Sequence, residues 1–382
     1  MKTVGIICEY DPLHLGHKKQ LDTIRALEGP DCGIVCLMSG DFVQRGKPAI
    51  IEKPLRARAA ILSGADLVLE APATLSLSSA EGFAAKGVSI LGGFCHKLCF
   101  GAETAQKEPL LSTAEALLSD AFPPALRREL DQGRSFPAAR TAALGSLGLD
   151  GDLLTLPNNI LAVEYCKAIL AQQSAMEPMP IHRPGSYHAA APDPSDPSAT
   201  SLRQLMYTGG DIRPFVPEAA VQLYQGASLH SLPAGERAIL YRLRTMTEDA
   251  FAALPYGSEG LWRKLMHAAH SGPSLDAIAT AVKSKRYTRT RIDRMIMCAF
   301  LGLTQGDMDA PPPYARVLAL NDKGRQILKT ARQHGLFPNA GERLDHPHQA
   351  IEDRLAALYG LFAIDAPGPP APKERPSFLS HI

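Results

Sequence analysis

The sequence predicts an α/β fold, with a domain built on a mostly parallel sheet followed by an all-helical domain. Two observations predict this architecture. In the first half of the chain, short apolar runs alternate with patterns of helical period, which is the signature of βαβ units. From about residue 213 to 305 the pattern is helical throughout.

Five apolar runs are the predicted strands, at 3–9, 33–38, 66–70, 97–100 and 178–182. Helical patterns lie between or before them, at about 17–27, 54–63, 78–91 and 158–172. Right-handed crossovers would gather the loops after these strands at one edge of the sheet. The stretch from about 104 to 156 is rich in alanine and leucine and lacks the turns of a new sheet, so it is interpreted as a helical insertion.

These patterns predict four regions along the chain. The sheet domain covers 1–212 and includes the insertion, and the helical domain covers 213–305. An α-rich extension is expected at 306–365. Residues 366–382 are too rich in proline for regular structure and are expected to form a disordered tail.

Composition limits the classes of partner. The formal charge of +1 gives no overall attraction to nucleic acid or to a membrane, so any basic surface must be local. Seven cysteines occur without a C-x-x-C pair, and Cys8, Cys36 and Cys99 fall in apolar runs, as small buried side chains do in a reducing compartment. Cys95, His96 and Cys99 could ligate a metal, but no second pair completes a tetrahedral site, so no metal site is predicted.

The start of the chain shows no targeting leader, and no apolar run approaches the roughly 20 residues that span a bilayer. A cytoplasmic protein without a membrane partner is therefore expected.

The most informative stretch is EYDPLHLGH, residues 9–17, which follows the first strand and opens a helix. Gly16 lets the backbone approach a ligand closely, and the first helical turn offers free N–H groups to an anion. His14 and His17 can donate hydrogen bonds to phosphate oxygens. The alternative is that both histidines only cap the helix or pair with a carboxylate, but the end of the first strand is where parallel sheets bind ligands. The chemistry indicated is attack of an oxyanion on the α-phosphate of a nucleoside triphosphate.

A second set of polar residues lies late in the sheet domain, where PSATSLRQLM (197–206) opens a helix. The hydroxyl of Thr200 and the guanidinium of Arg203 can hold the β- or γ-phosphate, although an ordinary N-cap by Ser198 or Thr200 is the better explanation when this segment is taken alone. Nucleotidyl transfer needs donors on both sides of the triphosphate, which favours the phosphate site.

Three further features are interpreted with alternatives. Asn158 and Asn159 either cap a helix or read an adenine or ribose edge. Arg183 stands at a strand end, where it reaches the same crevice or remains a surface side chain. The long loop after the second strand carries Asp41, Gln44 and Arg45, which we assign to the substrate side.

A local basic element spans residues 283–294, with a single acid, Asp293. Its cations predict a contact with a phosphate backbone, Tyr287 is available to stack on a base, and compensating i,i+4 acids are lacking. A solvated helix face is the alternative. RNA is favoured over DNA because no helix-turn-helix or zinc-finger spacing is present. The predicted RNA-binding residues are Lys283, Lys285, Arg286, Arg289, Arg291 and Arg294.

Taken together these residues resemble the tRNA(Met) cytidine acetate ligase family, within the nucleotidyltransferase superfamily that shares an H-x-G-H motif. The resemblance covers roughly residues 1–305. It rests on seven stretches in order, which are EYDPLHLGH (9–17), MSGDFVQRGKPA (38–49), GADLVLE (64–70), FGAE (100–103), PNNIL (157–161), SATSLR (198–203) and KRYTRTRI (285–292).

The resemblance implies a Rossmann-like nucleotidyltransferase domain and a helical tRNA-binding domain. It implies a ligase that joins acetate to ATP, forms acetyl-adenylate, and passes the acetyl group to the wobble cytidine of elongator tRNA(Met). Carried over by position, the ATP-binding residues are Ile7, Glu9, Tyr10, Asp11, Pro12, His14, Gly16, His17, Gly101, Asn158, Asn159, Arg183, Thr200 and Arg203. Which asparagine contacts ATP stays open.

The chain departs from the family pattern at three positions of the signature. Asp11 and Leu15 stand where the family usually has asparagine, and Leu13 where it has phenylalanine. A carboxylate at Asp11 is tolerable near a triphosphate if magnesium binds it or if Lys18 or Lys19 pairs with it.

In the expected mechanism acetate attacks the α-phosphate in line, and His14 and His17 stabilise the developing charge. Arg203 and Mg²⁺ would carry the leaving pyrophosphate, and no nucleophilic side chain is needed. Two alternatives remain: adenylylation of another small substrate, or a non-catalytic RNA-binding protein that has kept the nucleotidyltransferase fold.

Overall fold

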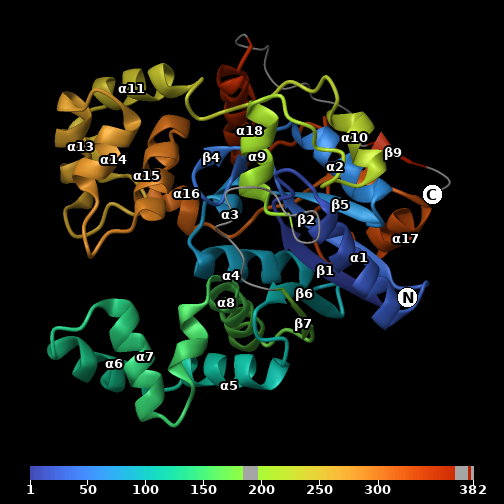
Figure 1. The fold of residues 1–382 in the computed structure, drawn as a ribbon, viewed down its shortest axis with the longest axis horizontal. Coiled ribbons are helices and arrows are strands. Elements are labelled where there is room, and N and C mark those ends of the chain that lie inside the picture. Colours follow the sequence, from blue (N-terminus) through green and yellow to red (C-terminus); the bar gives the residue numbers. More distant parts are fainter. Residues whose placement is uncertain (184–196, 366–376, 380–382) are drawn as a thin grey trace.

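The computed structural model describes residues 1–183, 197–365 and 377–379 of the chain. Its main sheet has seven strands in the order β7-β6-β1-β2-β5-β8-β9 (Figure 1). The strands are β1 Thr3–Cys8, β2 Gly33–Ser39, β5 Leu67–Ala71, β6 Lys97–Ala102, β7 Glu177–His182, β8 Arg316–Leu320 and β9 Ser377–Phe378. A separate antiparallel hairpin follows β2 and consists of β3 Phe42–Val43 and β4 Lys47–Pro48.

The five predicted strands are confirmed, and all of them pair in parallel. In β1, β2 and β5 nearly every side chain is buried, as expected for strands covered on both faces. Gly101 and Ala102, expected in the loop after the fourth strand, are the last residues of β6.

Two strands at one edge were not predicted. β8 pairs antiparallel with β5, and β9 pairs parallel with β8. Both come from regions expected to be an α-rich extension and a disordered tail, so that expectation is wrong for residues 316–320 and 377–378. The reason is that RVLAL is a short apolar run, whose periodicity fits a strand or a buried helix equally well. The rest of the predicted tail, 366–376 and 380–382, lies outside the described residues, as does the predicted loop 184–188.

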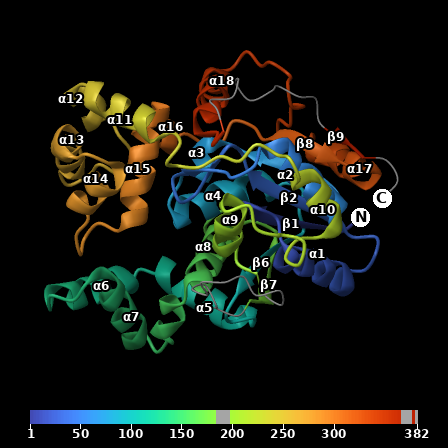
Figure 2. The ribbon, with the colours of Figure 1, turned by 45° about the horizontal axis from the view of Figure 1, so that its top comes forward.

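Helices cover both faces of the sheet (Figures 1 and 2). Because strand side chains alternate between faces, Ile34 and Cys36 pack with helices α1 and α2, whereas Val35 and Leu37 pack with α4, α8 and α17. The ranges are α1 Leu15–Glu28, α2 Lys53–Leu62, α3 Ala73–Ser76, α4 Ala80–Leu91, α8 Pro157–Ala171 and α17 Asp322–Ala331. The four helices predicted between or before the strands are α1, α2, α4 and α8.

The segment interpreted as an insertion is helical. It contains α5 Lys107–Leu118, α6 Phe122–Asp131, α7 Phe136–Ser146 and the 3₁₀ turn η1 Gly151–Thr155. Helices α6 and α7 form a hairpin that projects away from the sheet, as both Figure 1 and Figure 2 show.

The region from 197 to about 230 packs on the sheet domain. Helices α9 Ala199–Tyr207 and α10 Glu218–Tyr224 share a small core with Ile50, Ile51 and Ala59, next to α2. The helical domain proper has its own core, which runs from Ile239 to Leu303 and beyond. Its helices are α11 Glu236–Thr245, α12 Glu248–Ala252, α13 Leu261–Ser271, α14 Leu275–Val282, α15 Arg289–Leu301 and α16 Gln305–Asp309.

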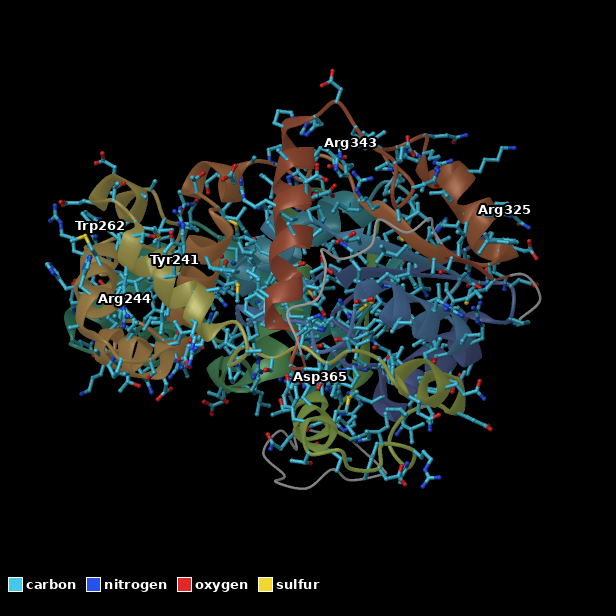
Figure 3. All side chains as sticks on the ribbon, turned by 90° about the horizontal axis from the view of Figure 1, so that it is seen from above. Tyr241, Arg244, Trp262, Arg325, Arg343 and Asp365 are labelled. Carbon is cyan, nitrogen blue, oxygen red and sulfur yellow. The ribbon has the colours of Figure 1, made fainter. Side chains whose placement is uncertain are left out.

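The C-terminal extension holds the two domains together through α18 Pro347–Tyr359 and the 3₁₀ turn η2 Gly360–Phe362. The ring of Phe42, in the β3–β4 hairpin, packs edge-on against Tyr359 and Phe362, with centroids 6.0 and 5.8 Å away. From above, Tyr241 and Trp262 of the helical domain lie far from Arg325 of α17 (Figure 3). Among the described residues, no helix combines the length and apolarity needed to cross a membrane.

Candidate active site

Two histidines at the start of α1 form the centre of the site. His14 is the N-cap, and its Nδ1 accepts a hydrogen bond from the backbone N–H of Gly16 at 3.1 Å. The Nδ1 of His17 accepts from the backbone N–H of His14 at 3.3 Å. An accepting Nδ1 in a neutral imidazole leaves the proton on Nε2. Both rings therefore present an Nε2–H donor to a ligand, and the helix start itself fixes the tautomer.

The rings are stacked at a centroid distance of 3.7 Å, and His14 is almost completely buried. Burial, together with the charges of Arg183 and Arg203, lowers the pKa of His14 to about 3. Burial likewise holds the pKa of His17 well below its ordinary value, with His14 and Arg183 acting in the same direction. Among the described residues, the Nε2 of His14 has no hydrogen-bond partner. A buried donor without an acceptor is costly, so it favours a ligand that brings an oxygen to that atom.

These pKa values predict a pH effect on stability. The folded pKa of His14 is lowered from 6.5 to about 3, so the unfolded chain binds a proton that the folded chain does not. The contribution of the neutral His14 to the free energy of unfolding is fully present above pH 6.5 and is lost as the pH falls towards 3. From pH 6.5 to 5 the loss from His14 is about 1.6 kcal/mol. Urea unfolding at pH 6.5 and at pH 5 measures this loss. Between the two pH values, the free energy of unfolding of the wild type should fall by about 1.6 kcal/mol more than that of His14→Asn. Equal losses in the two proteins would contradict the buried neutral imidazole.

Asp11 and Arg203 form an ion pair beside the histidines. One Arg203 nitrogen lies 2.6 Å from the Asp11 carbonyl oxygen and 3.3 Å from its carboxylate, and the other donates to the hydroxyl of Thr200 at 3.1 Å. The second carboxylate oxygen of Asp11 accepts the N–H of Ile50 at 2.6 Å. The partner of Asp11 is therefore Arg203 and neither of the lysines considered for it, and Lys18 pairs along its own helix with Asp22.

Arg183 lies along the other side of the site. Its backbone N–H donates to Ala102 at 2.8 Å, extending the edge of β6. A Cβ atom on Gly101 would lie 3.0 Å from Cδ of Arg183, so glycine at 101 makes room for this side chain. The positive charge of Arg183 acts on both histidines and lowers the pKa of each. The residues predicted after strands β1, β6 and β7 therefore come together.

The two asparagines have different surroundings at the start of α8. The carboxylate of Glu103 accepts both backbone N–H groups, from Asn158 at 3.2 Å and from Asn159 at 2.8 Å. The side chain of Asn159 is fully buried and forms hydrogen bonds with the backbone and hydroxyl of Thr104. Its amide is thus occupied in joining the segment after β6 to the start of α8, and which asparagine contacts a ligand stays open.

The remaining residues of the signature mainly support the histidines. Ile7 packs into the core against Gly87 of α4. Tyr10 is 1% exposed, and its ring lies 4.9 Å from that of His17. Pro12 is buried, and Gly16 supplies the N–H that orients His14. The side chains of Ile7 and Tyr10 pack in the core beside the motif, and the ATP-binding roles of the set stay predictions.

The substrate-side loop is attached to the motif by Glu9, whose carboxylate accepts the backbone N–H of Gln44 at 2.9 Å. Burial raises the pKa of Glu9, and the nearby Asp11 raises it further. Asp41 is buried and pairs with Lys53 at 3.0 Å, and Lys53 also pairs with Glu70 at 2.7 Å. Arg45 is exposed at the turn of the hairpin. Asp41 thus faces an internal ion-pair network, whereas Gln44 and Arg45 are nearer the solvent.

Sequence reasoning missed Arg56, which is completely buried. Its guanidinium donates to the carbonyl oxygens of Glu9, Ser39, Gly40 and Ile51, which come from the ends of β1 and β2 and the start of α2. It is a cationic clamp that holds the motif and the substrate-side loop together. The signal available in the sequence was its position on the apolar face of α2, beside Ala59 and Ala60.

The turn of the hairpin touches the helical domain. Gly46 has a φ of +70°, and a Cβ atom there would lie 2.6 Å from the backbone of Asp293 in α15. Only glycine fits this contact, because both the conformation and the space exclude a side chain.

We therefore expect Gly46→Ala to reduce the free energy of unfolding by about 2–4 kcal/mol. The matched control is Gly226→Ala, which has a similar φ of +76° but no atom within 4 Å of the new Cβ. This control should lower the free energy of unfolding by about 1 kcal/mol. Chemical denaturation measures both, and equal losses would show that the contact with α15 does not constrain the hairpin.

The basic element differs from its prediction in two ways. Tyr287 is buried beneath Lys264 and Arg291, so it is not free to stack on a base. The expected lack of compensating acids is also wrong, since Arg289 pairs with Asp276 and with Asp293, each at 2.8 Å.

A further acid, Glu259, pairs with Arg286 at 2.6 Å. These acids come mostly from α14 and from the 254–260 loop, which a scan of one segment does not reveal. Lys283 and Lys285 are exposed, whereas Arg291 and Arg294 are partly buried against Tyr256. The RNA-binding role of the element stays a prediction.

Comparison with known proteins identifies the family. The protein-family model described as HIGH Nucleotidyl Transferase matches residues 1–353 of this chain. The chain is similar to the tRNA(Met) cytidine acetate ligase of Clostridium acetobutylicum, with 36% identity over 361 residues that cover 88% of this chain and 89% of that one. It is 34% identical to that of Anoxybacillus flavithermus over 379 residues, 94% of both chains.

Two solved structures of a bacterial protein have the same fold as this chain. The fold superimposes on Thermotoga maritima TmcAL without ligand with a TM-score of 0.90, and on the same protein bound with alpha-thio ATP with a TM-score of 0.86. Both comparisons give 28% identity and cover 100% of each chain. With the two histidines, the parallel sheet and matches along almost the whole length, the chain belongs to the HIGH nucleotidyl transferase family and, within it, to the tRNA(Met) cytidine acetate ligases.

Proposed function

We propose that this protein activates acetate with ATP and transfers the acetyl group to the N4 amine of the wobble cytidine of elongator tRNA(Met), in the cytoplasm where both substrates occur. The observation that carries the proposal is the pair of neutral imidazoles whose Nε2–H groups point away from the helix start. One of these groups is buried and has no acceptor in the part of the chain that the structure describes. Phosphate oxygens are acceptors that match such donors.

In the first half-reaction, an acetate oxygen attacks the α-phosphorus of ATP and the bond to the β-phosphate oxygen breaks. Acetyl-adenylate and pyrophosphate result. Negative charge shifts to the non-bridging and leaving oxygens in the transition state, where His14, His17 and Arg183 donate from preorganised positions. Arg203 would hold the leaving pyrophosphate with Thr200, from the opposite side.

The magnesium ion expected with ATP has no cage of protein ligands. No group of three or more histidine, cysteine or acidic side chains that could bind a metal occurs among the described residues. The carboxylate of Asp11, within the motif, is occupied by Arg203 and by the backbone N–H of Ile50. We infer that Mg²⁺ arrives on the triphosphate, as is usual for this ion, and no step is derived through it.

In the second half-reaction, the cytidine N4 attacks the acetyl carbonyl carbon, the bond to AMP breaks, and the amine loses a proton. We assign Glu9 as the base that accepts this proton. Glu9 is the first residue of the motif and is hydrogen-bonded to the substrate-side loop, its pKa is raised by burial, and no ion pair of its carboxylate occurs within the described part of the chain.

Glu9→Gln keeps the shape and the bond from Gln44 but cannot accept the proton. We expect acetylcytidine formation to fall by about 100-fold or more, with acetate-dependent ATP–pyrophosphate exchange within about threefold of the wild type. Acetylation at the wild-type rate would remove Glu9 from the mechanism.

The experiment that tests the function combines the purified protein, ATP, magnesium, carbon-labelled acetate and total tRNA, followed by nucleoside mass spectrometry. Labelled acetylcytidine is the expected product. AMP or pyrophosphate formation without acetylcytidine would indicate another acyl donor or acceptor, and the absence of ATP turnover would leave only RNA binding.

A further inference from the structure

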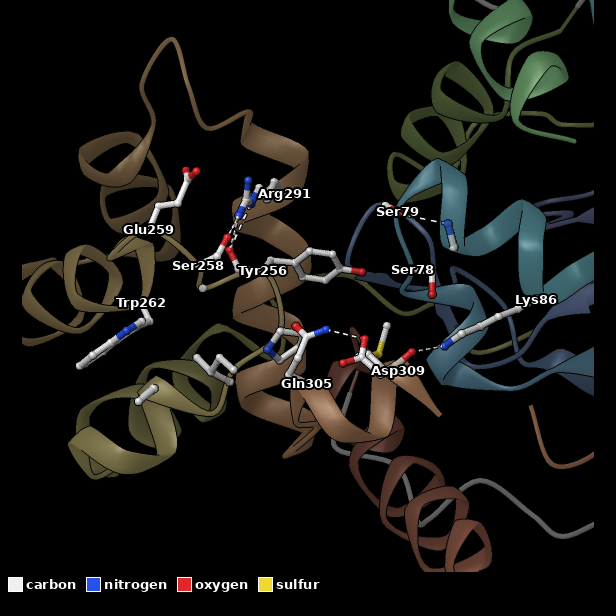
Figure 4. A pocket seen from close by; sticks show the side chains of 16 residues that line it. Ser78, Ser79, Lys86, Tyr256, Ser258, Glu259, Trp262, Arg291, Gln305 and Asp309 are labelled. Atoms are coloured by element: carbon white, nitrogen blue, oxygen red, sulfur yellow. Dashed lines mark hydrogen bonds between the residues drawn. The ribbon is translucent and has the colours of Figure 1, made fainter. Parts of the chain in front are cut away.

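A cavity of about 660 Å³ lies where the sheet domain meets the helical domain, away from the histidine motif (Figure 4). Ser78, Ser79 and Lys86, from the α3–α4 region, form one wall. Tyr256, Trp262 and Arg291, from the helical domain, form the other. Its size suits a ligand as large as a nucleotide.

The polar groups of the cavity are held in place by backbone atoms. The Lys86 ammonium donates to the carbonyl oxygens of Thr74, at 3.0 Å, and Met308. The guanidinium of Arg291 donates to the carbonyl oxygen of Tyr256 and, at 2.9 Å, to Ser258. No ion pair of Lys86 or Arg291 with a carboxylate is found in the described ranges. Of the two acids of the lining, Glu259 pairs with Arg286, whereas Asp309 accepts from the neutral amide of Gln305 and its charge acts on Lys86.

The aromatic wall is also fixed. The hydroxyl of Tyr256 donates to the carbonyl oxygen of Leu77 across the domain junction at 2.6 Å, which orients the ring. Arg294 lies 5.1 Å from the centroid of the Tyr256 ring. The backbone of Tyr256 and Glu259 is left-handed, with φ values of 68° and 59°, which is costly for non-glycine residues. Such strain is retained where a loop must present a side chain to a ligand.

We propose that this cavity binds one unstacked nucleotide of the RNA substrate, with its base on the Tyr256 ring and its phosphate at Lys86. The inference rests on the proposed function for the identity of the RNA. Single-stranded RNA is recognised by aromatic rings that stack on splayed bases together with cations that hold the backbone, and both are present here. The position beside the basic element, which contributes Arg291 to the lining, makes the cavity continuous with the predicted RNA surface.

The cavity carries its own probe, since Trp262 is the single tryptophan of the chain. Titration of the wild-type protein with a tRNA(Met) anticodon stem-loop should change the Trp262 fluorescence. A fully paired RNA duplex of equal length, added at the same concentrations, should not produce this change because it offers no unstacked base.

Two matched pairs of variants test the site. Ala252→Phe places a ring in the cavity, whereas Ala253→Phe places the same ring on the adjacent exposed position outside the lining. The first should weaken stem-loop binding about 10-fold and the second should not. Lys86→Gln should reduce the slope of log affinity against log salt by about 0.7, the value for one lost phosphate contact, and Lys329→Gln on α17 should not change it.

Equal affinities for Ala252→Phe and Ala253→Phe, or an unchanged salt slope in Lys86→Gln, would overturn the proposal. Acetate-dependent ATP–pyrophosphate exchange separates this result from a failure of the proposed function, because it does not involve the cavity. If the wild type lacks exchange, the ligase function fails, while the stem-loop titration still decides whether the cavity binds RNA.

Discussion

Replacement of His14 by asparagine is expected to lower acetate-dependent ATP–pyrophosphate exchange by about 100- to 1,000-fold, as the loss of one preorganised donor to developing charge does. Asparagine is itself a good N-cap, so its side-chain oxygen can still accept the Gly16 N–H that His14 now binds. The asparagine side chain is too short to place a donor where the Nε2–H group of His14 lies. The variant therefore separates catalysis from helix capping.

Two measurements make this result specific. Thermal unfolding of His14→Asn at pH 7.5 should match the wild type closely, because the cap is kept. His14→Gln, whose amide nitrogen reaches about the position of Nε2, should recover part of the exchange rate. If His14→Asn retains the wild-type rate, the histidine is only a cap, which is the alternative reading of the motif.

The second large effect is expected for Arg56→Met, which should reduce the free energy of unfolding by about 4 kcal/mol or more. The reason is that the buried guanidinium satisfies four carbonyl oxygens, and each buried polar group left without a partner costs about 1–3 kcal/mol. Methionine fills a similar volume but donates no hydrogen bond.

Arg58→Met on the same helix is the matched control, since Arg58 is only partly buried and no hydrogen bond of its guanidinium is found in the described chain. Its cost should stay within about 0.5 kcal/mol. Urea denaturation followed by circular dichroism measures both variants. A small loss in Arg56→Met would mean that water can replace the guanidinium, and that the clamp does not hold the motif to the substrate-side loop.

The helix-start motif shows why some site residues are readable in a sequence. His14, Gly16 and His17 are close along the chain, and the hydrogen bonds that fix their tautomers run within one helical turn. The same is true of Thr200 and Arg203, which contact each other three residues apart. Local spacing therefore predicts such groups before any tertiary structure is known.

Contacts between distant segments were not readable in the same way. Asp11 and Arg203 are joined across the sheet domain, and the partners assumed for Asp11 were its neighbours in sequence. The acids that neutralise the basic element come mostly from outside it, and Tyr287 is buried by a lysine from α13. Charge pairing and burial depend on which segments meet, and that is decided by packing.

By itself, the sequence determined the five parallel strands, the helices between them, the helical character of the second region, and the family, because each depends on local periodicity or on residues close in the chain. Only the tertiary structure decided that Arg316–Leu320 joins the sheet, that Arg56 clamps two loops, and that Tyr256, Lys86 and Arg291 enclose a cavity at the domain junction. The physical reason is that a buried charge, an edge strand or a cavity is defined by neighbours that chain folding brings from far away in sequence.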